Sequence, residues 1–184
     1  MRRFSLYIAL ASIVLWPLGL AAQNMKPVSK PEFKSIEVKH FTNAEGVQLS
    51  PNFQKVFYAS FLAELQRQNI SEQVVEDGTP VNDTPTQGSQ SYKFIVLEGR
   101  FVAVKEGRQK GDKFEAGSAD LEIRYFRRSD HKGFPDKIRC KISLTGPFQN
   151  DEQKVPELAG VEAANAVRKF FYPSKAGWVD QLGW

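Results

Sequence analysis

The sequence of 184 residues contains one cysteine, Cys140, and two histidines, His40 and His131. A single cysteine excludes an intramolecular disulfide framework and any zinc site built from several thiolates. Neither histidine has a second histidine or cysteine at metal-ligand spacing, so we expect no metal site. In an oxidising compartment a lone thiol is either buried or bridged to another chain, and the strand pattern around Cys140 favours burial.

The sequence also lacks the motifs that identify common enzyme classes. No G-x-S-x-G segment is present to form a nucleophile elbow, and Gly117-Ser118 matches only part of that motif. Gly107, Gly111 and Gly117 are too widely spaced to cradle a phosphate, and no Walker lysine motif follows them. We therefore expect no catalytic residues, no cofactor and no enzymatic activity.

Long apolar runs are confined to the beginning of the chain. Two arginines precede an uncharged apolar run from Leu6 to Leu15, and the residues that follow it include Pro17, Gly19, Ala21 and Ala22. This order predicts a secretory signal peptide over residues 1–22, cleaved after Ala21 or Ala22. An uncleaved membrane anchor is the alternative, although the run is shorter than the roughly 20 residues of a transmembrane helix. Because no later segment approaches that length, we expect a periplasmic or secreted protein.

The excess of positive charge is small. The chain has 25 Lys plus Arg and 21 Asp plus Glu, a formal net charge of +4. Arg2 and Arg3 would leave with the leader, which reduces the excess to about two charges. So small an excess, together with export, argues against a nucleic-acid partner.

Two helices are predicted from apolar residues at spacings of three and four. Ser50 can cap a helix over residues 51–68, with Pro51 in its first turn. An apolar stripe dominated by alanine predicts a second helix over residues 155–171. Its small side chains would allow a close approach to a sheet.

Apolar and polar residues alternate in several other segments, as in strands with one buried face. The predicted strands cover residues 33–41, 73–76, 92–105, 117–127 and 137–145. Residues 106–116 and 129–136 are predicted hairpin connections, and residues 77–91 a long mobile loop. Gly99 interrupts the third strand, where a β-bulge or the close approach of another backbone would fit.

These elements predict one α/β domain, a two-layer sandwich in which two helices cover one face of a mixed sheet of about five strands. The domain would span residues 33–171. A flexible linker over residues 23–32 would precede it, and a tail over residues 172–184 would follow. The tail contains Trp178 and Trp184, which we expect to fold back over the core, because a secreted monomer seldom leaves two tryptophans in water. An exposed contact segment is the alternative.

The last two predicted strands carry charged side chains on their outer faces. Antiparallel pairing would bring Asp120 and Glu122 beside Arg139 and Lys141, where opposite charges are mutually favourable. At one end of this strand pair basic residues outnumber acids, which indicates a binding surface for an anionic polymer or lipid headgroups. The candidate residues are Arg124, Arg127, Arg128, Lys132 and Lys137.

Three short segments resemble a known group of proteins. Residues 34–41 (KSIEVKHF), 96–101 (VLEGRF) and 116–123 (AGSADLEI) look like the conserved blocks of an uncharacterised family of bacterial exported proteins. Its members are often lipoproteins and are similar in layout to the amino-terminal domain of TolB and to CsgG and LpoB. The resemblance implies a mixed sheet covered by helices and a role in envelope binding or assembly. This chain lacks the lipidation cysteine of that group.

We therefore predict an exported, non-catalytic envelope protein that binds another envelope component or a second copy of itself. One alternative is a small hydrolase of envelope polymer, with Glu98 and either Asp120 or Glu122 as its carboxylate pair. Another is an assembly subunit that docks its Trp178 to Trp184 tail in a neighbour. His40 and His131 are expected at a strand end and in a solvated turn, without a catalytic role.

Overall fold

The computed structural model describes residues 26–79, 91–106, 108–115, 117–134, 136–143 and 154–173. Its main sheet contains β1 (Phe33–Val38), β2 (Thr42–Asn43), β3 (Ser71–Glu76), β4 (Phe94–Lys105), β7 (Ser118–Arg127) and β8 (Ile138–Ser143). The helices are α1 (Pro51–Arg67) and α2 (Lys154–Phe171), and a short 3-10 helix, η1 (Ser91–Lys93), precedes β4. A separate hairpin consists of β5 (Arg108–Lys110) and β6 (Lys113–Glu115).

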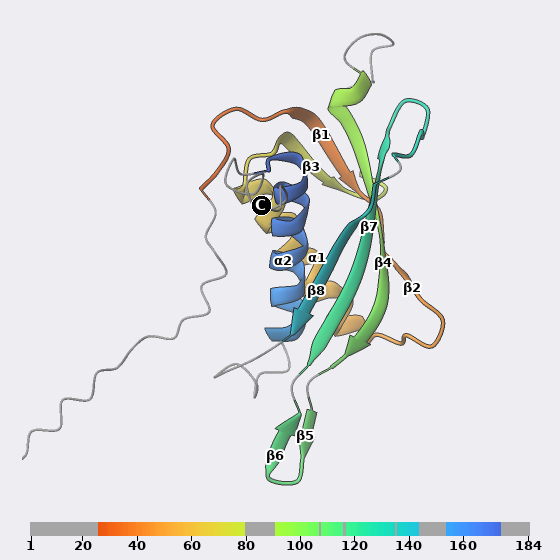
Figure 1. Cartoon of the computed structure of the whole chain (residues 1–184), viewed down its shortest axis with the longest axis vertical. Coiled ribbons are helices and arrows are strands. Elements are labelled where there is room, and N and C mark those ends of the chain that lie inside the picture. The colour runs from red at the N-terminus through yellow and green to blue at the C-terminus, as the bar shows by residue number, and fades with distance from the viewer. Residues whose placement is uncertain are drawn as a thin grey trace, which may run out of the picture.

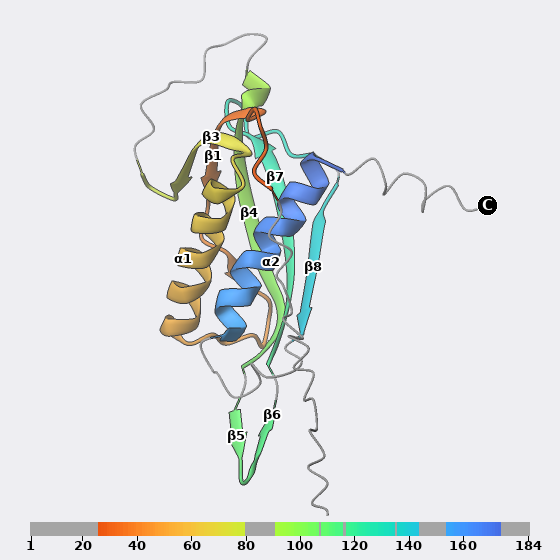
Figure 2. The ribbon, with the colours of Figure 1, turned by 90° about the vertical axis from the view of Figure 1, so that its left-hand side faces the viewer.

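Both helices lie on one face of the mixed sheet, as Figures 1 and 2 show. The strand order is β3-β1-β4-β7-β8, and β2 pairs with β4 beyond the end of β1. β1 is parallel to β3 and β4, whereas β4, β7 and β8 form an antiparallel meander. The predicted two-layer α/β sandwich is therefore confirmed.

Helix α1 begins where its capping residue predicts. The Ser50 hydroxyl accepts a hydrogen bond from the Phe53 amide at 3.2 Å, and Pro51 occupies the first turn. Phe57, Phe61 and Leu65 are fully buried on the face that covers the sheet. This apolar face fixes α1 on the sheet, since burial of such side chains contributes about 1.5–3 kcal/mol each.

The two helices pack closely at Gly160. A Cβ atom at this position would lie 2.5 Å from the Phe57 carbonyl oxygen and 2.8 Å from the Phe61 amide nitrogen. Further along the same contact, the Gln68 side-chain amide donates to Asn165 Oδ1 at 2.7 Å. The glycine of α2 thus allows a close approach to α1. The sequence predicted a close approach to the sheet instead.

The chain bends between β1 and β2, and Phe41 fills the bend. Its ring lies against Gly99, where any Cβ would collide with the ring carbons. The close approach at Gly99 therefore involves a side chain, whereas the prediction named a bulge or a backbone. The actual register shift of β4 lies between Phe101 and Ala103.

Residues 26–32, the predicted linker, lie against the ends of both helices. The Val28 amide donates to the Gln68 carbonyl at 2.9 Å, and the Glu32 amide donates to the Tyr172 hydroxyl at 2.9 Å. The predicted leader, residues 80–90 of the predicted loop and the tail from residue 174, with Trp178 and Trp184, lie outside the described residues. Within the described ranges, neither helix has the length and apolar character needed to cross a bilayer.

Candidate functional site

Most residues of the predicted basic surface are paired with carboxylates. Lys137 lies 2.7 Å from Glu122, Arg127 lies 2.6 Å from Asp130, Arg128 lies 3.2 Å from Glu37 and Arg124 lies 3.6 Å from Glu122. Lys132 is exposed in the connection between β7 and β8. These residues do not form one continuous patch, because strand alternation places Arg124 and Arg128 on one face of β7 and Arg127 on the other.

The helices leave one face of β4, β7 and β8 uncovered, on the side of the sheet away from the helices in Figure 1, and we call it the open face. The observed register places Arg100 of β4 and Arg139 of β8 on either side of Glu122 in β7. Asp120 lies opposite Lys141, at 3.9 Å between the charged atoms. The predicted cross-strand arrangement of Asp120 and Glu122 with Arg139 and Lys141 is therefore confirmed.

Positive charge exceeds negative charge on the open face. Its cations include Arg100, Arg124, Lys137, Arg139 and Lys141, and the carboxylates of these three strands on this face are Glu98, Asp120 and Glu122. Within the described part of the chain, Arg100 and Arg139 form no ion pair. Hydrogen bonding to Lys137, with the charges of Arg124 and Arg139, lowers the pKa of Glu122. One ionised carboxylate therefore cannot neutralise the cations that surround it.

Two shallow hollows lie on the open face and meet at Glu122. One has a volume of about 470 Å³ and is lined by residues that include Val102 and Arg139. The other, of about 210 Å³, is lined by residues that include Arg100 and Arg124. The exposed arginines therefore border concave surface rather than a flat rim.

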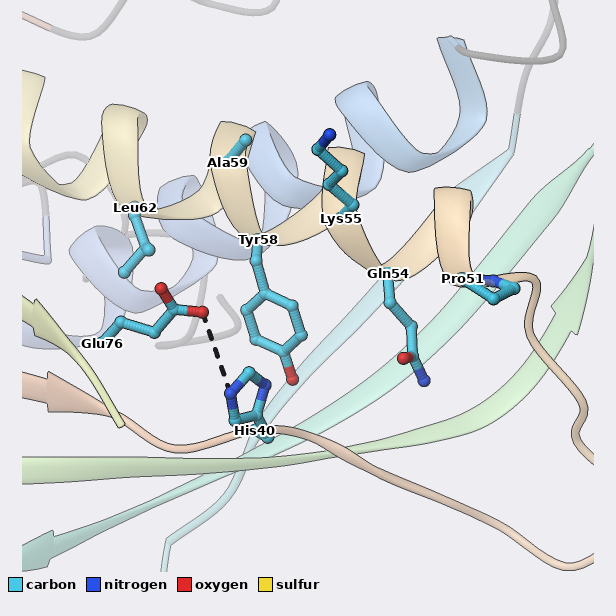
Figure 3. Close-up of a pocket in the computed structure, with 8 residues that line it drawn as sticks. All are labelled: His40, Pro51, Gln54, Lys55, Tyr58, Ala59, Leu62 and Glu76. Atoms are coloured by element: carbon cyan, nitrogen blue, oxygen red, sulfur yellow. Dashed lines mark ion pairs between the residues drawn. The ribbon is translucent and has the colours of Figure 1, made fainter. Parts of the chain in front are cut away.

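A further pocket, of about 430 Å³, opens where β1 and β3 end beside α1 (Figure 3). Tyr58 points from α1 toward His40, and Glu76 reaches His40 from the end of β3, with His40 Nε2 and Glu76 Oε1 3.8 Å apart. Gln54 and Lys55 supply further polar groups on the α1 side. Such a mixed lining suits a small polar ligand.

The chemistry of this pocket favours binding over nucleophilic catalysis. Burial raises the pKa of Tyr58 to about 12, and its hydroxyl accepts a hydrogen bond from the Phe41 amide. The phenol therefore stays protonated to a higher pH than an exposed tyrosine would. The residues that line the pocket, all of them described, include no serine, threonine or cysteine to act as a nucleophile.

The carboxylates of the predicted hydrolase lie beside basic side chains. Glu98 Oε1 lies 3.3 Å from His131 Nε2, and Asp120 and Glu122 have the basic partners given above. A glycosidase general acid needs a raised pKa, and the pKa of Glu122 is lowered. Glu122 is thus unsuited to the acid role.

The remaining candidate residues lie at separate positions. His131 is an exposed turn residue whose ring stacks on Phe126 with centroids 4.5 Å apart, and His40 is exposed beyond the end of β1. No group of three metal-ligating side chains occurs among the described residues. Cys140 is buried, as predicted, and burial raises its pKa to about 12.

Sequence reasoning missed Arg100 and the pocket residues Tyr58 and Glu76. Arg100 and Glu98 are two residues apart in one strand and therefore lie on the same face. This spacing could have predicted that Arg100 lies on the open face. Its place beside Glu122 depends on the register between β4 and β7. Tyr58 and Glu76 meet His40 only through the packing of α1 over β3, for which the local sequence gives no signal.

Comparisons with known proteins identify a shared fold. No family model and no curated protein matches the chain. A Xanthomonas campestris protein of the DUF330 family model has a similar structure, with 10% identity, a TM-score of 0.51 and coverage of 86% of this chain and 94% of that chain. The PelC dodecamer from Paraburkholderia phytofirmans is similar at 10% identity and a TM-score of 0.45, over 75% of this chain and 94% of that one.

Lipoprotein GNA1162 from Neisseria meningitidis is similar at 11% identity and a TM-score of 0.40, over 75% of this chain and 98% of that one. The proteins with similar structures thus include a DUF330 protein and a bacterial lipoprotein. At such identities the likeness concerns the fold alone. The resemblance to TolB, CsgG and LpoB stays a prediction.

Proposed function

We propose that the chain is an exported, non-catalytic binding protein of the bacterial envelope whose open face holds an acidic segment of another envelope protein. The leader-like sequence over residues 1–22 supports export. The observation that carries the binding role is the pair of exposed arginines, Arg100 and Arg139, which flank a carboxylate that other cations already engage.

The geometry suits an extended chain with spaced carboxylates. Arg100 and Arg139 lie on the two strands that flank β7, so their backbones are roughly 10 Å apart, twice the spacing of neighbouring strands. A guanidinium group binds a carboxylate through two parallel hydrogen bonds, which an ammonium group cannot do. The hollows beside the arginines favour a peptide segment over a flat membrane surface.

The proposal is tested by titrating a labelled peptide of alternating glutamate and serine with the full chain and following fluorescence anisotropy. The double variant Arg100→Gln/Arg139→Gln should weaken binding by at least about tenfold, since hydrogen bonds to charged groups contribute roughly 1.5–3 kcal/mol each. The matched control Lys55→Gln/Lys169→Gln removes two exposed charges from the helical layer and should leave the affinity unchanged. Added salt should weaken the complex.

Equal losses in both double variants would contradict the proposal, because binding would then follow net charge and not the open face. Stronger binding to a polyuronate than to the peptide would assign the surface to an acidic polysaccharide. Hydrolysis of an envelope polymer that is lost in Glu98→Gln would favour the alternative of a carboxylate-dependent enzyme.

A further inference from the structure

One end of the molecule combines exposed aromatic side chains with lysines. Figures 1 and 2 both place η1, the connection between β7 and β8, and the end of α2 at this end, opposite the β5–β6 hairpin. Tyr92 of η1 is 52% exposed and Phe134 of the connection is 41% exposed. They are two of the three large hydrophobic residues that are exposed in the described part of the chain. Exposed hydrophobic residues that gather at one place indicate an interaction site.

Phe134 is held rigidly on the domain. Its ring stacks on Tyr125 with centroids 4.5 Å apart, and Tyr125 contacts Phe170 and Phe171 of α2. The Phe134 amide also donates to the Tyr125 carbonyl at 3.3 Å. The exposed ring is therefore presented by the folded core and is not the tip of a loose loop.

The charges around these rings are mostly positive. The lysines at this end are Lys30, Lys93, Lys132 and Lys169, and none of them forms an ion pair within the described ranges. Lys93 Nζ lies 6.0 Å from the centroid of the Tyr92 ring. Asp130 is already paired with Arg127 and Glu72 with Lys34, so the other nearby carboxylates are Glu32, Asp136 and Glu98, which lies 3.3 Å from His131. The surface therefore complements an anionic partner.

Both ends of the described chain meet at this surface. Val28 is bound to the carbonyl of Gln68 at the end of α1, and Tyr172 at the end of α2 accepts a hydrogen bond from Glu32. The sequence before residue 26 includes the apolar run from Leu6 to Leu15, and the sequence after Pro173 includes Trp178 and Trp184. Aromatic residues and lysines are the side chains that favour the interface between lipid and water.

From these observations we infer that this end of the molecule docks on an anionic phospholipid bilayer. We call it the aromatic end, and it consists of Tyr92, Phe134 and the four lysines named above. The lysines approach the headgroups, and the two exposed rings enter the interfacial layer. The β5–β6 hairpin then points away from the bilayer, and the open face stays accessible from the side. This surface is separate from the open face, so the inference does not depend on the proposed acidic partner.

The depth of single spin labels tests the orientation on vesicles of phosphatidylcholine and phosphatidylglycerol. Cysteines are introduced one at a time in the full chain as Phe134→Cys, Tyr92→Cys and Gln54→Cys, with Cys140 protected by burial. We expect labels at positions 134 and 92 to become accessible to oxygen and shielded from aqueous relaxation agents. The label at position 54, in the first turn of α1 and far from the end of that helix at the docking surface, should remain aqueous. Because the depth of each label is measured separately, the experiment distinguishes docking of the aromatic end from insertion of the leader alone. In the latter case the labels at positions 92 and 134 would remain aqueous.

Charge reversal provides the second measurement. Lys93→Glu/Lys132→Glu should reduce partitioning of the full chain onto these vesicles by about tenfold or more, whereas Lys55→Glu/Lys141→Glu, away from the aromatic end, should not. Labels at positions 92 and 134 that stay aqueous on bound chains would overturn the inference. Equal partitioning onto pure phosphatidylcholine, or equal losses in both double variants, would overturn it as well. If only peptide binding on the open face fails, the proposed acidic partner is wrong and the membrane inference stands.

Discussion

At the scale of single residues, Tyr58 joins the core to the candidate pocket. Its ring is buried under α1, and its hydroxyl accepts the hydrogen bond of the Phe41 amide in the bend after β1. The same side chain forms one wall of the pocket beside His40. A change at Tyr58 therefore affects both the stability of the bend and the shape of the pocket.

Tyr58→Phe should lower the free energy of unfolding by about 1–3 kcal/mol, because the buried Phe41 amide would lose its acceptor. Urea denaturation of the full chain measures the change. Tyr92→Phe removes an equivalent hydroxyl from an exposed ring and should change stability little. If the two variants were equally stable, the hydrogen bond to Phe41 would contribute nothing.

Alkaline pH should destabilise the fold through Tyr58 and Cys140. Burial raises the pKa of each to about 12, from ordinary values of 10.0 and 9.0, so folding favours the protonated forms. The contribution of these two groups to stability should therefore be constant below about pH 9 and should be lost as the pH rises toward 12, since the unfolded chain releases these protons first. Urea denaturation at a series of pH values measures the slope. In Tyr58→Phe/Cys140→Ala the slope should be smaller, and an unchanged slope would assign the effect to other groups.

At the scale of elements, the helix–helix contact depends on Gly160. Gly160→Ala should destabilise the protein by roughly 1–3 kcal/mol, because the added methyl group would collide with the backbone of Phe57 and Phe61. Helix propensity alone predicts the opposite sign, a gain of about 1 kcal/mol. Thermal and urea denaturation decide between these outcomes, with the exposed Lys169→Ala in the same helix as a control expected to have little effect.

The elements that local patterns define were predictable from the sequence. The predicted helices over 51–68 and 155–171 correspond to α1 and α2, because capping and periodicity are local signals. The pairing of β2 with β4 was not predictable, since it requires the bend at Phe41, which contacts with Tyr58 and Gly99 stabilise. The parallel pairing of β1 with β4 likewise depends on the whole topology.

The same division applies to the candidate surfaces. Asp120, Glu122, Arg139 and Lys141 were placed correctly because adjacent antiparallel strands have a simple register. The basic residues Arg127 and Arg128 were grouped by sequence, although strand alternation sends them to opposite faces of β7. The net charge of each surface therefore could not be predicted by counting lysines and arginines, because it depends on strand register and on ion pairs.

At the scale of the whole molecule, three surfaces occupy different sides of one small domain. The open face lies opposite the helices, the aromatic end lies where η1 precedes β4, and the His40 pocket opens beside α1 where β1 and β3 end (Figures 1 and 3). A bilayer at the aromatic end would leave both other surfaces free. The domain could then hold a membrane and the proposed acidic partner at the same time.

The tail provides a whole-molecule test, because its two tryptophans can serve either the membrane or the core. If the aromatic end docks on lipid, Trp178→Ser/Trp184→Ser should lower partitioning onto phosphatidylglycerol vesicles several-fold, since the sequence that follows α2 loses two side chains that favour the interface. The free energy of unfolding should stay within about 0.5 kcal/mol of the parent value, as for other surface substitutions. Trp178→Tyr/Trp184→Tyr keeps interfacial aromatic rings and should retain most of the partitioning. A large loss of stability in the serine variant would instead show that the tail folds back over the core, as the sequence alone predicted.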